Sequence, residues 1–384
     1  MSAKEGLVIG IDASRNRSGG AISHIIGILS EGFPEKFGIS KVHLWSYRNL
    51  LDAVPNKPWL IKHNPQALEK SILSQILWQR FILPHEAKRC SCQIFLNTDA
   101  GTFSKVRPAV TMSRDMLSYE PGVIELFGFG KARFRLMLLH YFQNRSLRNA
   151  DGVIFLTRYA ADTIQRSCGP LKSISYIPHG VGDIFKRISP ISDWPKSGER
   201  PLRCLYISNT EVYKHQWVVV AAIALLRSRG YNMRLKLVGG GTGPAQNMLN
   251  RAIKAYDPMR NFVEQLEFLP HGELPNHLAH ADIFIFASSC ENMPNTLVEA
   301  MAVGLPIACS NRGPMPEILA DGGVYFNPVD TGSIAAAIEQ IIISPSLRVA
   351  IAERAKNLSQ QYNWKRCAEE TLAFIVKTLN DCQK

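Results

Sequence analysis

Short apolar runs alternate with helix-like stretches along most of this 384-residue chain. The run Leu7–Ile11, a glycine-containing loop and the apolar stretch Ala21–Leu29 predict a strand followed by a helix. Further short apolar runs predict strands in the same half, at Gln93–Leu96, Ala109–Met112, Val153–Leu156 and Ser175–Ile177. Strands that alternate with helices are typical of parallel sheets with helices on both faces.

The same alternation restarts in the second half of the chain. The pattern predicts strands at Cys204–Ser208, Arg234–Val238, Gln265–Leu269, Ile283–Ala287 and Pro306–Cys309. It predicts helices at Val218–Arg227, Pro244–Ala255, Leu274–His280, Thr296–Val303, Gly332–Ile343 and Leu347–Gln360. Two such runs predict an α/β protein of two doubly wound, Rossmann-like domains with parallel sheets. Ligands in this fold bind at the carboxyl ends of the strands, so we expect the site in a cleft between the domains.

The segment 182–201 separates the two runs. It contains prolines and glycines and has no apolar period, which is typical of a linker. We therefore expect one domain at residues 1–181 and a second domain that begins at residue 202.

Composition narrows the class of protein. The chain is 46% apolar and 20% charged, which excludes a disordered chain, a fibre and a membrane-embedded protein. Its longest apolar run, Trp217–Leu226, is about half of a bilayer span, and its first residues do not resemble a signal peptide. The eight cysteines are scattered, with Cys90 and Cys92 as the only close pair. We expect reduced thiols, no zinc site and a cytoplasmic protein.

Positive charge is concentrated in the first half. The net charge is +12, and residues 1–180 hold 23 Lys/Arg against 13 Asp/Glu. This excess predicts an anionic partner, which could be nucleic acid, an anionic membrane surface or a phosphorylated substrate. The basic, aromatic-rich stretch 127–148 leaves two readings open: a helix on a membrane surface, or a core helix with a solvated basic edge.

Two carboxylates eight residues apart form the strongest local signal. Glu291 follows the predicted strand Ile283–Ala287, and Glu299 lies in the first turns of the next predicted helix. Loop amides and a helix N-terminus form an anion cradle, and adjacent carboxylates accept hydrogen bonds from hydroxyls, so the pattern suits a sugar nucleotide. The alternative is structural, because Thr296-x-x-Glu299 also has the form of a capping box.

Three other loops are candidates with structural alternatives. Lys214, in the loop that opens a predicted βα unit, is either a phosphate ligand or a solvated lysine. The glycines of 239–243 suit either the approach of a ligand or close backbone packing. The loop 18–20 is a weak anion-site candidate.

Several motifs of other enzyme classes are missing. The chain has no D-x-D, which commonly holds a divalent ion against a nucleotide diphosphate, and no G-x-S-x-G or HExxH. We therefore expect no metal and no cofactor, with Lys214, helix dipoles and loop amides neutralising phosphate charge.

Taken together, these residues resemble the retaining glycosyltransferases of family 4 (group 1), which have the GT-B fold. Glu291-x7-Glu299 is similar to the E-x7-E motif of that family. It is followed, in the order typical of the family, by Ala300-Met-Ala-x-Gly-Leu-Pro306, Pro314-x-x-Glu317, Gly322-Gly and Phe326-Asn-Pro328. Ile177-Pro-His-Gly-Val181 resembles the end of the first domain, and 266–274 the strand and helix at the nucleotide base.

The resemblance implies a role for each domain. Residues 1–181 would form the acceptor-side domain and 202–366 the nucleotide-sugar domain, with a helix at 367–384 crossing back. Lys214 and Glu291 would be catalytic. The donor site implied by the resemblance comprises Gly19, Gly20, Asn209, Lys214, Gly239, Leu269, Glu291, Met293, Pro294, Asn295, Thr296, Leu297 and Glu299. Within it, Glu299 would hold the ribose, Glu291 the transferred sugar, and Lys214 the diphosphate.

The chain departs from the family pattern at two places. Asn209 stands where the family usually has an arginine that contacts the donor phosphates. Many members also have a histidine after a first-domain strand, where this chain has Ser113, Arg114 and Asp115 as acceptor-side candidates.

The resemblance therefore predicts a retaining, metal-independent hexosyltransferase. It favours mannose from GDP-mannose as donor and a saccharide or undecaprenyl-diphosphate-linked acceptor in bacterial surface polysaccharide (O-antigen, lipopolysaccharide) synthesis. The basic first domain predicts peripheral binding to the inner face of the cytoplasmic membrane, and we expect no nucleic acid partner. Three alternatives stay open: a UDP-hexose or UDP-GlcNAc donor, a sugar-nucleotide 2-epimerase that would use His179, His215 or His271, and a non-enzymatic binder of anionic polymers.

Overall fold

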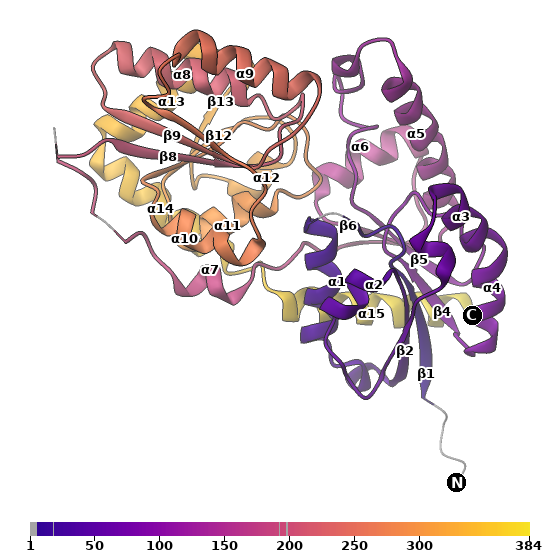
Figure 1. The fold of residues 1–384 in the computed structure, drawn as a ribbon. Coiled ribbons are helices and arrows are strands. Elements are labelled where there is room, and N and C mark those ends of the chain that lie inside the picture. Colours follow the sequence, from indigo (N-terminus) through magenta and orange to yellow (C-terminus); the bar gives the residue numbers. More distant parts are fainter. Residues whose placement is uncertain (1–5, 18, 192, 197–198) are drawn as a thin grey trace. The chain divides into compact units, whose positions relative to one another are not determined.

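The computed structural model describes residues 6–17, 19–191, 193–196 and 199–384 and divides into two compact units (Figure 1). The first unit comprises residues from 1–119, 130–180 and 363–384, and the second comprises residues from 120–129 and 181–362. The sequence analysis predicted domain boundaries after residues 181 and 366, and the chain passes between the two units after residues 180 and 362.

The first unit is built on a seven-stranded parallel sheet of order β3-β2-β1-β4-β5-β6-β7. Its strands are β1 (Leu7–Asp12), β2 (Ile39–Trp45), β3 (Leu60–His63), β4 (Ile94–Asn97), β5 (Ala109–Ser113), β6 (Gly152–Phe155) and β7 (Ile174–Tyr176). Its α-helices are α1 (Gly19–Glu31), α2 (Arg48–Ala53), α3 (Ile72–Leu77), α4 (Leu83–Arg89), α5 (Lys131–Asn149), α6 (Arg158–Cys168) and α15 (Trp364–Cys382). Short helical turns lie at η1 (Pro34–Phe37), η2 (Gln66–Glu69) and η3 (Trp78–Ile82).

The second unit contains a six-stranded parallel sheet of order β10-β9-β8-β11-β12-β13. Its strands are β8 (Leu202–Ile207), β9 (Met233–Val238), β10 (Val263–Leu266), β11 (Ile283–Phe286), β12 (Ile307–Ser310) and β13 (Val324–Phe326). Helices α8 (Gln216–Ser228), α9 (Pro244–Tyr256) and α13 (Thr331–Ile343) cover one face, and α10 (Leu274–Ala279), α11 (Asn295–Val303) and α14 (Pro345–Ser359) the other (Figure 1). Shorter elements are η4 (Ile124–Phe127), α7 (Asp183–Arg187), η5 (His271–Glu273) and α12 (Met315–Leu319).

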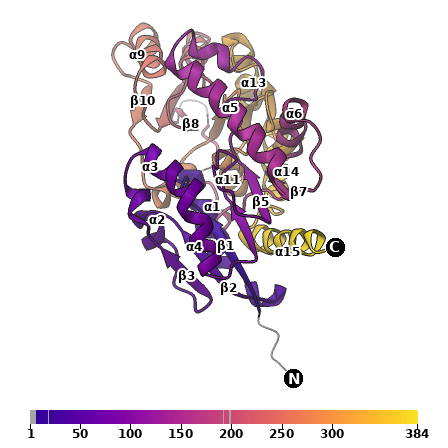
Figure 2. The same cartoon turned by 90° about the vertical axis from the view of Figure 1, so that its right-hand side faces the viewer.

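The C-terminal helix belongs to the first unit. Figure 2 shows α15 alongside α1, and a Cβ built on Gly27 of α1 would lie 2.3 Å from the Trp364 ring. The ring stacks near His24 and His179 as well, with centroids 6.0 and 5.9 Å away. Close packing that only glycine permits therefore anchors the start of α15 to this unit.

Burial explains which strands the sequence pattern predicted. The central strands β4, β5, β6, β11 and β12 are buried along their whole length and read as continuous apolar runs. The pattern missed β2, in which Ser40 and Lys41 are exposed, the half-buried edge strand β3, and β13. The strand predicted at Gln265–Leu269 is wrong at its boundaries. It runs over Val263–Leu266 because the Asp257 carboxylate binds the amides that lead into it, and Phe268 is exposed outside the sheet.

Among the described residues, no single helix is both long enough and apolar enough to cross a membrane. Only a bent pair, Thr331–Ile343 with Pro345–Cys382, reaches that length and composition together.

Candidate functional site

The strand order of the second unit reverses between β8 and β11. The chain runs outward through β8, β9 and β10 to one edge, then returns to pair β11 with β8 and continues outward on the other side. Loops that leave two such neighbouring strands diverge above the sheet, which opens a crevice at their carboxyl ends. The two loops at this point carry Lys214 and Glu291.

The structure brings Lys214 and Glu291 together as an ion pair, although 77 residues separate them. The Lys214 ammonium donates to Glu291 Oε1, and the two side chains are only 10% and 15% exposed. The ammonium also lies over the Tyr213 and Phe286 rings, 5.2 and 5.8 Å from their centroids. Lys214 is therefore not a solvated loop lysine but a largely buried cation held by a carboxylate and aromatic faces.

Backbone contacts fix the Lys214 loop. The Tyr206 hydroxyl at the end of β8 donates to the Lys214 carbonyl at 2.7 Å, and the Ser289 amide donates to the Tyr213 carbonyl at 2.8 Å. His215 occupies the left-handed region, with φ 51°, and its Nε2 lies 2.9 Å from Ser289 Oγ. These contacts join the β8 and β11 loops, so the ion pair is held from both sides.

Glu299 lies on the buried side of α11 and is bonded to a residue that our sequence analysis placed only in the epimerase alternative. His271 Nε2 donates to Glu299 Oε1 at 2.7 Å, while Glu299 Oε2 is buried without a hydrogen-bond partner among the described residues. Burial raises the pKa of Glu299, and the hydrogen bond from His271 opposes that rise. The same bond raises the pKa of His271. A buried acceptor without a donor is free to accept a hydrogen bond, such as one from a ligand hydroxyl or from water.

The capping-box alternative for Glu299 is wrong. α11 begins at Asn295 without a side-chain cap, so Thr296 lies inside the helix, and its hydroxyl donates to the Ile207 carbonyl of β8 at 3.3 Å. Glu299 bonds to His271 instead of the first turn. Both motif residues are therefore used in tertiary contacts across the switch point.

The remaining donor-side candidates of the second unit, apart from Gly239, follow the ends of β8, β10 and β11. Met293 and Pro294 precede α11, Asn295 and Thr296 open it, and the Leu297 amide donates to the Pro294 carbonyl at 3.1 Å. Asn209 is exposed in the β8 loop, and Leu269 is half-buried beyond β10.

Close packing accounts for the glycine-rich loop. A Cβ on Gly239 would lie 2.3 Å from the Ser208 carbonyl oxygen, and φ there is +114°. On Gly241 it would lie 2.7 Å from the Thr210 carbonyl oxygen. The structure therefore favours the packing explanation for these glycines over ligand approach.

A second polar network occupies the corresponding switch point of the first unit, between β1 and β4. The buried Asp12 carboxylate accepts from Gln79 Nε2 at 2.6 Å, and the Thr98 hydroxyl donates to Asn16 Oδ1 at 2.7 Å. Burial raises the pKa of Asp12, although its hydrogen bonds oppose the rise. Our sequence analysis missed these residues. The positions of Asn16 and Thr98, shortly after the neighbouring strands β1 and β4, could have indicated two of them.

The three acceptor-side candidates lie at the end of β5, near this network. Ser113 is buried, and the Arg114 guanidinium donates to Asn16 Oδ1 at 3.3 Å and lies 3.7 Å from the Asp99 carboxylate. Burial raises the pKa of Asp115, whose carboxylate accepts from the Leu117 amide at 2.9 Å.

The glycine loop of the first unit is only partly described. Gly19 and Gly20 are exposed at the start of α1, and a Cβ on Gly19 would meet no atom within 4 Å. Ser18, the first residue of the predicted loop, lies outside the described residues.

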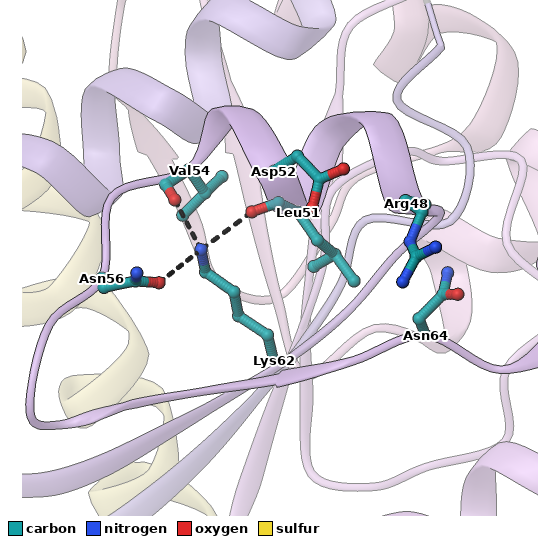
Figure 3. Close-up of a pocket in the computed structure, with 7 residues that line it drawn as sticks. All are labelled: Arg48, Leu51, Asp52, Val54, Asn56, Lys62 and Asn64. Carbon is teal, nitrogen blue, oxygen red and sulfur yellow. Dashed lines mark hydrogen bonds between the residues drawn. The ribbon is translucent and has the colours of Figure 1, made fainter.

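A hollow of about 380 Å³ in the first unit contains none of the predicted site residues (Figure 3). Its lysine, Lys62, donates to the carbonyl oxygens of Leu51 and Val54 and to Asn56 Oδ1. These three bonds use every donor of the ammonium and satisfy carbonyl groups at the end of α2. The hollow is therefore a structural feature of the α2–β3 connection.

Comparison with known proteins finds similarity to glycosyltransferases, mainly in the second unit. Residues 192–358 match the family model described as "Glycosyl transferases group 1". O-antigen chain mannosyltransferase B of Escherichia coli is 28% identical over 44% of this chain and 44% of its own length. The GDP-mannose-dependent alpha-(1-6)-phosphatidylinositol monomannoside mannosyltransferase of Mycolicibacterium smegmatis is 27% identical over 56% of this chain and 59% of its own. The chain thus spans about half the length of these curated relatives.

Solved structures share the fold over nearly the whole chain. Sucrose-phosphate synthase from Thermosynechococcus elongatus superposes with a TM-score of 0.77 at 18% identity, covering 98% of this chain and 100% of its own. Anabaena Alr3699/HepE, solved in complex with UDP-glucose, gives 0.70 at 18% identity with the same coverage. The predicted GT-B fold is confirmed, as is the resemblance to group 1 glycosyltransferases over residues 192–358.

Proposed function

We propose that this protein is a retaining, metal-independent hexosyltransferase that takes mannose from GDP-mannose. The observation that carries the proposal is the largely buried Lys214–Glu291 pair at the β8–β11 switch point, together with a Glu299 carboxylate on the following helix that has one unpartnered oxygen. The match of residues 192–358 to group 1 glycosyltransferases supports the reaction class, and the names of the two curated relatives support mannose.

Each of the three side chains binds a different part of the donor. Glu299 Oε2 offers an acceptor to a ribose hydroxyl, which would satisfy an otherwise costly buried oxygen. Lys214 offsets the charge of the diphosphate as it leaves. Glu291 accepts a hydrogen bond from Lys214 in the structure. When the diphosphate binds the Lys214 ammonium instead, the Glu291 carboxylate turns toward a sugar hydroxyl.

The proposed step needs no protein nucleophile. The acceptor hydroxyl oxygen bonds to the anomeric carbon on the face from which the diphosphate departs. The bond from that carbon to the phosphate oxygen breaks, and the hydroxyl proton passes to the departing oxygen. The nucleoside diphosphate leaves, and the configuration at the anomeric carbon is retained. The protein contributes positioning and charge stabilisation.

The acceptor is a saccharide, or a saccharide on undecaprenyl diphosphate, at the inner face of the cytoplasmic membrane. Helix α5 supports this location, because Phe134, Met137 and Tyr141 are each more than half exposed, although the helix also buries Leu136, Gln143, Asn144 and Leu147. An apolar surface on a basic helix is typical of binding to anionic lipid.

Membrane binding is tested by co-sedimentation with vesicles of anionic phosphatidylglycerol and of neutral phosphatidylcholine. We expect binding to the anionic vesicles only, and a marked loss with Phe134→Ser plus Met137→Ser. Met259→Ser, at an exposed methionine of the second unit, is the matched control and should bind as the unaltered protein does. Equal binding of the double variant would refute a role for α5.

Donor choice is tested by thermal unfolding with GDP-mannose, UDP-glucose and UDP-GlcNAc in the presence of EDTA, followed by a transfer assay with the stabilising donor. A ligand at 100 times its Kd adds about 2.7 kcal/mol. We expect stabilisation by GDP-mannose, lost in Lys214→Ala and Glu299→Gln. The controls Lys236→Ala and Glu264→Gln remove partners of a more exposed ion pair and should respond normally. No response to any of the three donors would refute the proposed donor site.

A UDP-hexose donor is the second candidate, because a neighbour with the same fold was solved with UDP-glucose. Stabilisation by UDP-glucose without a response to GDP-mannose would select it and keep the reaction class. Release of a free epimer without acceptor would instead identify a 2-epimerase.

A further inference from the structure

Two histidines and a cysteine that take no part in the candidate donor site converge on one face of the first unit's sheet. His43 lies on β2, His63 ends β3, and Cys90 follows the last turn of α4. β2 and β3 pair in parallel with Trp45 opposite His63, so His43, Trp45 and His63 share a face. The cysteine is brought to them by the helix that packs there.

The side chains offer three metal-binding atoms at close range. His43 Nδ1 and His63 Nε2 are 2.8 Å apart, and one ligand atom from each of the three residues lies within 4.8 Å of the others. No other group of three or more histidine, cysteine or acidic side chains meets this criterion in the described ranges. Imidazole nitrogen and thiolate sulfur together suit zinc and exclude the oxygen-preferring Mg²⁺ and Ca²⁺.

In contrast to the expectation of no zinc site drawn from cysteine spacing, we propose that His43, His63 and Cys90 bind one zinc ion, with water in the fourth tetrahedral position. Two nitrogens on tetrahedral zinc stand roughly 3.3 Å apart, given zinc–nitrogen bonds of about 2.0–2.1 Å. The observed 2.8 Å therefore requires the imidazoles to separate by roughly half an ångström. Such a movement is small for side chains, of which only His43 is fully buried.

The surroundings fit this assignment. Trp45 stacks on His63 with centroids 4.6 Å apart and holds its plane. Glu86 lies close enough to affect both His63 and Cys90 and supplies negative charge, while Lys41 and Arg89 are the nearby cations that oppose it.

Zinc binding at this site involves no oxidation or reduction. The Cys90 thiol loses its proton to solvent, and the thiolate and one lone pair from each imidazole bind the metal. The histidine that carried its proton on the shared nitrogen carries it on the other ring nitrogen instead. The ion would tie the end of α4 to the β2–β3 edge of the sheet, so its expected role is to stabilise the first unit.

The experiment is a cobalt titration of the full chain after treatment with EDTA. We expect one equivalent of Co²⁺ to produce a thiolate-to-cobalt charge-transfer band and tetrahedral d–d bands, and one equivalent of Zn²⁺ to abolish both. Cys90→Ser should lose the charge-transfer band, and His63→Ala should bind at least tenfold more weakly. Circular dichroism of the metal-free variants checks that they are folded.

Matched controls separate this site from chance binding. Cys92→Ser removes the neighbouring thiol, and His85→Ala removes an exposed histidine of the same helix. Both should titrate as the unaltered protein does. A band that survives in Cys90→Ser, that disappears equally in Cys92→Ser or His85→Ala, or that never saturates would overturn the proposal.

Discussion

The Glu291→Gln substitution gives the sharpest test of the Lys214–Glu291 pair. In the structure the Glu291 carboxylate binds the Lys214 ammonium, which the proposed function assigns to the diphosphate. A charge-assisted hydrogen bond in a largely buried pair contributes about 1.5–3 kcal/mol, which corresponds to roughly 10- to 150-fold in a binding constant. Glutamine keeps the shape and removes this competing charge. We therefore expect GDP to bind about tenfold more tightly, while transfer from GDP-mannose falls.

The measurement is isothermal titration of GDP into both proteins in EDTA, paired with initial rates of transfer. The two readouts moving in opposite directions would distinguish competition for Lys214 from a general loss of structure. Glu264→Gln is the control, because its partner Lys236 lies in a more exposed pair. GDP affinity that is unchanged or weaker in Glu291→Gln would refute the reasoning.

The same pair predicts a stability effect. Removing one member of a buried ion pair costs about 3–5 kcal/mol, and the partial exposure of both side chains places this cost near the lower end. The double variant Lys214→Met plus Glu291→Gln should recover part of the loss, as measured by urea unfolding. Strict additivity of the two single changes would show that the side chains are not coupled.

Two further predictions concern other parts of the structure. The pKa of His271 is raised by its hydrogen bond to Glu299, so the stability that this pair contributes is full below about pH 6.5 and falls as pH rises through the raised value. The difference in unfolding free energy between the unaltered protein and His271→Ala should therefore shrink above that pH. A difference that grows would contradict the assignment. Gly27→Ala places a Cβ 2.3 Å from the Trp364 ring and should cost about 1–3 kcal/mol in thermal unfolding, whereas Gly19→Ala, with no atom within 4 Å, should be close to neutral.

Local patterns predicted most of the fold because buried parallel strands consist largely of consecutive apolar residues. β4, β5, β6, β11 and β12 were found in this way, and the alternation of strands with helices gave two doubly wound units. The pattern failed at β2, β3 and β13. At β2 and β3, Ser40, Lys41 and Lys62 interrupt the apolar signal where the sheet meets solvent. Edge and partly exposed strands carry weaker periodic signals than central ones.

The sequence by itself indicated Glu291, Glu299 and Lys214 as candidate site residues of the second unit, since they stand at strand ends and in an ordered series of motifs. It did not determine their partners. The Lys214–Glu291 and His271–Glu299 bonds span 77 and 28 residues. Only the pairing of β8 with β11 and the packing of α11 bring such side chains together, because sequence separation carries no information about which loops meet above a sheet. The cluster of His43, His63 and Cys90 arises in the same way, from three elements whose spacing follows no metal-binding pattern.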